Sequence, residues 1–140
     1  VIWLGQRTGL LVLIKTMAEP EVTKRKPVML ILVESDPRTS PRPGEAIRVA
    51  GGIGVWEQVK VNVVLRHVAS RACAENAAQL EDGQLFKQFI PMVRESGGEV
   101  YVQADDETMQ TIDGDTLMKR NIKDSRLIEL SAEADYLLRF

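Results

Sequence analysis

The strongest constraint on the fold is a short apolar stretch that lies between two prolines. Val28 to Val33 form the unbroken apolar run VMLILV, with Pro27 directly before it and Pro37 shortly after it. Proline disfavours a helix on either side, and a run this short cannot cross a bilayer. An apolar, β-branched run of this kind is typical of a strand that is buried on both faces in a mostly parallel sheet.

Strands and helices are expected to alternate along the rest of the chain. Further strands are predicted at 59–65, 100–102, 117–122 and 136–140, and helices near 44–56, 68–73, 85–93, 104–111 and 124–134. Such alternation implies right-handed crossovers between parallel strands. The sequence therefore predicts a three-layer α/β fold, with about five mostly parallel strands and helices on both faces. A single domain is expected over residues 27–140.

Two of the predicted helices contain residues that disfavour a helix. Pro91 lies inside the pattern of the 85–93 helix, so we expect a kink or a break there. Gly51, Gly52 and Gly54 interrupt the 44–56 helix, each at a propensity cost of up to about 1 kcal/mol. We expect these glycines to allow close packing against the sheet or a neighbouring subunit. They do not form a phosphate loop, because they lie within a helical pattern and no Gly-Lys-Ser/Thr motif follows.

Composition argues against several classes of protein. The formal net charge is −2, with 44% hydrophobic and 27% charged residues, which is ordinary for a globular domain and unlike a basic nucleic-acid-binding surface. Cys73 is the single cysteine, so neither an intrachain disulfide nor a cysteine-cluster metal site is expected. We expect no metal, no cofactor and no membrane span. A reducing, cytoplasmic setting is the expected location.

The first 26 residues differ from the rest. Gly9 to Ile14 are apolar but too few to span a membrane, and Lys15 and Glu19 break any secretory cleavage pattern after them. A polar run begins at Met17 and is typical of a natural amino terminus. We therefore expect Met17 to be the biological start and residues 1–26 to be a mobile, partly non-native segment.

Four stretches resemble the DsrE/DsrF-like (DsrEFH) family of small sulfur-metabolism proteins. They are VMLILVESDP, AIRVAGGIGVWEQVKVNVVL, LFKQFIPMVRESGGEVYV and LIELSAEADYLLRF, and they cover most of residues 27–140. The resemblance implies a five-stranded parallel sheet flanked by helices. It also implies a homo-oligomer, a trimer or hexamer, or assembly with related DsrE/F-like subunits.

The sulfur-relay members of that family carry a cysteine just after the third strand, where they accept sulfur as a persulfide and pass it to a partner. In this chain the corresponding residues, from Val102 to Asp106, include Gln103 and Ala104 but no cysteine. The sulfur-accepting role is therefore not assigned to any residue. Gln103 and Ala104 are instead expected to contribute to a ligand-binding site.

Cys73 and His67 are the remaining candidates for catalysis. Cys73 follows Ala69 by four residues on the apolar face of a predicted helix, which favours a buried structural thiol over a reactive one. His67 follows the second strand, and histidine is a common general base near neutral pH, but the sequence places no nucleophile beside it. A surface residue at a helix start is the alternative interpretation.

Polar residues after the first strand form the best candidate pocket. Ser35, Asp36 and Arg38 follow the buried run at the carboxyl end of the predicted sheet, where ligands collect in open α/β folds. Together with Arg42 and the start of the next helix they could hold an anion. A solvated connecting loop is the alternative.

An acidic patch follows the third predicted strand. It contains Asp105, Asp106, Glu107, Asp113 and Asp115. Because its spacing does not match a calcium loop, we expect a solvated rim or a surface that faces a basic partner.

Three functional hypotheses remain open. The first is a DsrE-like accessory subunit that binds a partner, such as a sulfur-carrier protein, or a small anion at the carboxyl edge of the sheet. The second is a sulfur carrier that uses Cys73. The third is an enzyme that acts on a small anionic metabolite with His67, Asp36 and Arg38.

Overall fold

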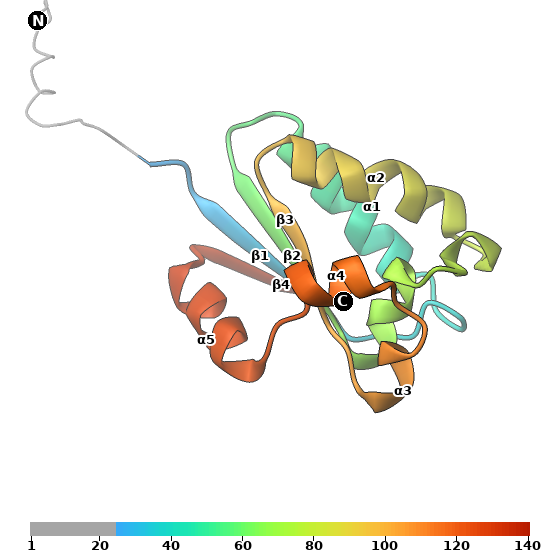
Figure 1. Ribbon diagram of the computed structural model, residues 1–140. Coiled ribbons are helices and arrows are strands. Elements are labelled where there is room, and N and C mark those ends of the chain that lie inside the picture. Colours follow the sequence, from blue (N-terminus) through green and yellow to red (C-terminus); the bar gives the residue numbers. More distant parts are fainter. Residues whose placement is uncertain (1–24) are drawn as a thin grey trace, which may run out of the picture.

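The computed structural model describes residues 25–140, and these form a four-stranded parallel sheet with helices on both faces (Figure 1). The strand order is β3-β2-β1-β4. The strands are β1 (Val28–Val33), β2 (Lys60–Arg66), β3 (Glu99–Gln103) and β4 (Tyr136–Arg139). The helices are α1 (Arg42–Gly54), α2 (Gly83–Glu95), α3 (Asp106–Met109), α4 (Gly114–Arg120) and α5 (Asp124–Glu133), with 3-10 turns η2 (His67–Cys73) and η3 (Ala77–Gln79). The predicted α/β class is confirmed.

The apolar run between the two prolines is β1, and it lies between β2 and β4. Its last four residues are buried, as are the five central residues of β2. Both faces of these strands are covered, so the usual alternation of polar and apolar residues is absent. The expectation of a strand buried on both faces is therefore confirmed.

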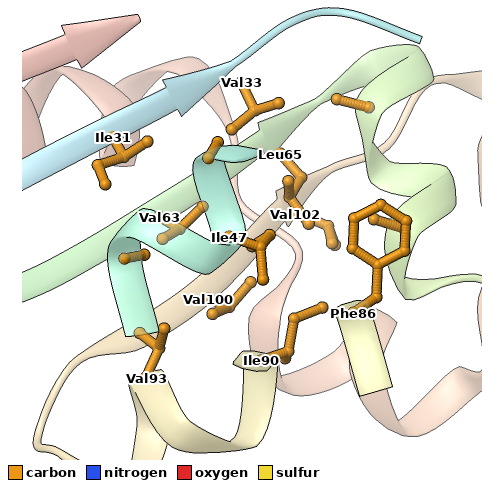
Figure 2. Packing of buried hydrophobic residues seen from close by; sticks show 14 of the residues in the cluster. Ile31, Val33, Ile47, Val63, Leu65, Phe86, Ile90, Val93, Val100 and Val102 are labelled. Carbon is orange, nitrogen blue, oxygen red and sulfur yellow. The ribbon is translucent and has the colours of Figure 1, made fainter. Parts of the chain in front are cut away.

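The larger half of the core lies between the sheet and the helices α1 and α2. Figure 2 shows side chains of both helices pointing toward the strands: Ile47 of α1, and Phe86, Ile90 and Val93 of α2, against Val63, Leu65, Val100 and Val102. On the opposite face Leu127 and Leu130 of α5 pack against Leu30, Leu32 and Val64. Burying each such side chain is worth about 1.5–3 kcal/mol, which makes these two layers the main source of stability.

Helices α1 and α2 pack closely where a glycine removes a side chain. A Cβ atom placed on Gly51 would lie 2.7 Å from a ring carbon of Phe89 on α2, whereas Gly52 has nothing within 4 Å. The close approach expected for this glycine cluster is thus made at Gly51, to a neighbouring helix rather than to the sheet. Helix α2 continues through Pro91, so the helix is not broken at that position.

The strand predicted at 117–122 is wrong. Residues 114–120 form helix α4, whose first turn is capped by Asp113: its carboxylate accepts a hydrogen bond from the backbone N–H of Thr116 at 2.9 Å. The Asp113-Gly114-Asp115 run suits a turn, but here it starts a helix. Only Asn121 retains a strand-like contact, as an isolated bridge to Val102 at the outer edge of β3. The described residues therefore contain four strands rather than about five.

Strand β4 is an exposed edge. It pairs with β1 on one side only, and all four of its residues are exposed, including Tyr136, Leu137 and Leu138. Its main contacts within the described chain are with β1, whereas α1 packs on β1 and β2 and α2 packs on β3. This strand consequently leaves apolar side chains and one row of backbone hydrogen-bonding groups uncovered within the described chain.

The expectations for the amino terminus fall mostly on residues 1–24, which lie outside the described residues. Arg25 and Lys26 are described and exposed, and the Arg25 guanidinium pairs with Asp135 at 3.0 Å beside the start of β4. Within residues 25–140 no helix has both the length and the apolar character needed to cross a membrane.

Candidate functional site at the carboxyl edge of the sheet

The loop after β1 places a charged cluster at the carboxyl edge. The Arg38 side chain pairs with Asp36 through Nη2 at 2.9 Å, and the Arg38 backbone N–H also donates to the Asp36 carboxylate at 2.9 Å. The hydrogen bonds from Arg38 are the main reason that the pKa of Asp36 lies below its usual range, with a smaller contribution from the charge of Arg71. Arg71, on η2, in turn pairs with Glu107 at 3.2 Å. We call Asp36, Arg38, Arg71 and Glu107 the Asp36 cluster.

Ser35 lies next to this cluster. It is half-buried, and its hydroxyl oxygen is buried with no hydrogen-bond partner among the described residues. Of the candidate ligand-binding residues, the structure therefore groups Ser35, Asp36 and Arg38 at one loop.

A second polar network lies on the α5 side of the same edge. The Glu34 carboxylate accepts hydrogen bonds from Arg66 at 2.8 Å and from Arg139 at 2.6 Å. These bonds, led by the one from Arg139, lower the pKa of Glu34. Gln103 accepts a hydrogen bond from Arg66 at 2.8 Å and donates one to Asp124 at 2.5 Å. This Glu34 network joins the ends of all four strands to the start of α5.

Gln103 thus has a structural role where the resemblance would place sulfur chemistry. Its side chain is buried, and its oxygen and nitrogen are both engaged. The backbone N–H of Ala104 donates to the Asn121 side chain at 3.1 Å. Gln103, the last residue of β3, belongs to the Glu34 network, and Ala104 directly follows it. No hydrogen bond among the described residues joins either residue to the Asp36 cluster.

His67 lies at the junction of β2 and η2, where the two segments meet in an unusual backbone geometry. Its φ of 52° is in the left-handed region, which histidine tolerates better than most residues. Its side chain is exposed, and its carbonyl accepts a hydrogen bond from the Ser70 hydroxyl at 2.6 Å. The exposed position at a helix start matches the surface interpretation, and its charge helps to lower the pKa of the neighbouring Asp105.

Cys73 makes no side-chain hydrogen bond to either polar group within the described part of the chain. It packs against the main core and lines an open cavity of about 300 Å³ together with Phe86, Ile90, Lys87 and other residues of α2 and η3. Burial raises the pKa of the Cys73 thiol to about 11, and the charge of Arg94 only partly offsets that effect. Because the thiolate is the nucleophile, this setting disfavours the reactive form of the Cys73 side chain near neutral pH.

The acidic patch separates into helix caps and ion pairs. Asp105 caps α3 and Asp113 caps α4, and hydrogen bonds from Thr108 and Thr116 lower the pKa values of these carboxyls. Asp115 pairs with Lys119 at 3.2 Å. Among residues 25–140 no group of three or more acidic, histidine or cysteine side chains is arranged to hold a metal ion.

Two residues of the edge, Arg66 and Arg71, are not among the sites predicted from the sequence. Arg66 is the last residue of β2, just as Glu34 directly follows β1, and this placement at the carboxyl end of a buried strand could have identified Arg66. Arg71 lies on the 3-10 turn η2, whose geometry differs from that of the helix predicted near 68–73.

Comparison with known proteins supports the fold. No protein-family model matches the chain, and no curated protein sequence matches it significantly. Among solved structures, the ychN protein from E. coli aligns with a TM-score of 0.61 and 15% sequence identity, over 81% of this chain and 99% of that chain. At such low sequence identity, the structural alignment supports a shared fold and carries no information on function. The chain therefore has the DsrE-like α/β fold that the sequence resemblance implied.

Proposed function

We propose that this protein is an oligomeric accessory or binding subunit with a DsrE-like fold, related to sulfur-relay proteins, and that it does not itself carry sulfur. The observation that supports this most is the environment of the last residue of β3. Gln103 is buried there and engaged in the Glu34 network, and the single thiol of the chain, Cys73, has a pKa raised to about 11. A persulfide relay needs an accessible thiolate.

A binding role is supported by the polar groups that meet at the carboxyl edge. The Asp36 cluster and its neighbouring cavities follow β1 and β2, where open α/β sheets bind ligands. An oligomer is supported by β4, whose apolar residues are exposed along an unpaired edge of the described chain.

The alternative of a sulfur carrier retains one supporting observation. Cys73 lines an open cavity whose other residues include Lys87 and Arg94, two cations that favour a thiolate. The raised pKa argues against it, because desolvation outweighs these charges.

Incubation with a persulfide donor followed by intact-protein mass spectrometry separates the two. We expect no added sulfur on the native chain. Ala104→Cys in a Cys73→Ser background serves as the positive control, because it puts a thiol just after β3. One sulfur atom adds about 32 Da, and a gain of one or more such steps on the native chain would support the sulfur-carrier alternative, because Cys73 is its single thiol. The Cys73→Ser variant alone gives the background.

A further inference from the structure

A small cavity beside the Asp36 cluster has a lining with no acidic residue. It measures about 200 Å³ and is lined by Arg38, Arg71, Asn76, Gln79 and Leu80. Two guanidinium groups and two side-chain amides thus surround one space, with a leucine as the single apolar wall. Such a lining offers hydrogen-bond donors and positive charge, which suit an anion.

Arg71 brings an incompletely satisfied guanidinium to this cavity. Its side chain is only 14% exposed, yet the one ion pair it makes within residues 25–140 is with Glu107, which is 75% exposed. Its Nε is buried and has no acceptor among the described residues. A buried guanidinium with donors left over is costly, so the fold holds a charge that its own residues do not fully compensate.

Arg38 is held in place with a donor to spare. Asp36 binds its Nε and Nη2, at 3.1 and 2.9 Å, and thereby fixes the plane of the guanidinium. Nη1 has no partner among residues 25–140, and neither do the side-chain amides of Asn76 and Gln79. The cavity therefore has free donors on Arg38, whose guanidinium is held by Asp36, and on two exposed side-chain amides.

We propose that this cavity binds a small oxyanion, namely a carboxylate or phosphate group that forms hydrogen bonds with Arg38 and Arg71. Guanidinium groups bind both kinds of anion through paired N–H donors. The volume is below that of pockets which hold drug-sized ligands, so the ligand is a small acid or a single phosphate group. This inference deepens the proposed ligand-binding role and rests on it.

The test is calorimetric titration of the full chain with sodium phosphate and, separately, sodium acetate, at pH 7 and constant ionic strength set by sodium chloride. We expect one of the two anions to bind at one site per chain, and the pair of titrations identifies which group is recognised. Gln79→Glu places a carboxylate in the lining at nearly unchanged size. It is expected to weaken binding by about tenfold or more, through charge repulsion at close range.

Gln88→Glu is the matched control, because Gln88 is exposed on α2 and does not line the cavity. It makes the same change in net charge and is expected to leave binding unchanged. The inference is overturned if neither anion binds, or if the two variants weaken binding equally. Either result leaves the persulfide measurement unaffected, so failure of this inference can be told apart from failure of the proposed accessory role.

Discussion

At the scale of single residues, the carboxyl edge is organised by paired charges. The Glu34 carboxylate accepts hydrogen bonds from Arg66 on β2 and Arg139 on β4, and each of these bonds favours its ionised form. Its pKa is therefore lowered in the folded chain. The stabilisation is present above the ordinary value of 4.5 and is lost as the pH falls through the lowered pKa.

This linkage predicts the behaviour of Glu34→Gln. At pH 7 the variant is expected to lose about 1 kcal/mol of unfolding free energy, because both arginines lose a charged acceptor at a partly exposed site. Below pH 4.5 the difference between variant and native chain should shrink, because the unfolded chain takes up a proton at Glu34 first and the folded chain follows as the pH falls through the lowered pKa. Urea unfolding of both proteins at pH 7 and pH 3 measures this. A difference that stays constant with pH would contradict the linkage.

At the scale of secondary-structure elements, the contact between α1 and α2 depends on one glycine. Gly51→Ala is expected to destabilise the fold by about 1–3 kcal/mol, because the new methyl group overlaps Phe89 in a packed interface.

Gly52→Ala is the matched control in the same helix. Because Gly52 is exposed with nothing nearby, alanine there should stabilise by up to about 1 kcal/mol through helix propensity. Denaturant midpoints of both variants give the comparison, and equal shifts of the same sign would show that packing at Gly51 does not matter.

Much of this arrangement could be predicted from local patterns. The run from Val28 to Val33 is too apolar and too short to be anything but a buried strand, and alternation then fixes the layers. Helix α4 could not be recognised, because Asp113 is equally suited to a turn and to a helix cap. The cavity could not be recognised either, because Arg71 and Gln79 are brought to Arg38 only by the 3-10 turns η2 and η3.

At the scale of the whole molecule, the exposed edge is the main feature that the described chain leaves unexplained. Tyr136 and Leu137 are more than half exposed on β4, which is an edge strand of the sheet. Monomeric proteins usually protect such edges, so we expect β4 to be covered in an oligomer.

The oligomer can be tested with a charge at this edge. Leu137→Arg is expected to shift the mass measured by light scattering toward that of one chain, because it puts a charge into the proposed contact. Met118→Arg is the control, because Met118 is 87% exposed on α4, at a site away from β4. A native chain that is monomeric at high concentration would remove the oligomer from the proposal.

The central claim is that the lone thiol is not available for sulfur transfer, and its pKa tests this most directly. The alkylation rate of Cys73 by iodoacetamide should be measured against pH beside a small free thiol, with Cys73→Ser as the blank. With a pKa of about 11, the rate should keep rising up to pH 10 without reaching a plateau, while the free thiol levels off. A midpoint near pH 7 would contradict the account, because it would show a reactive thiolate where we infer a buried thiol.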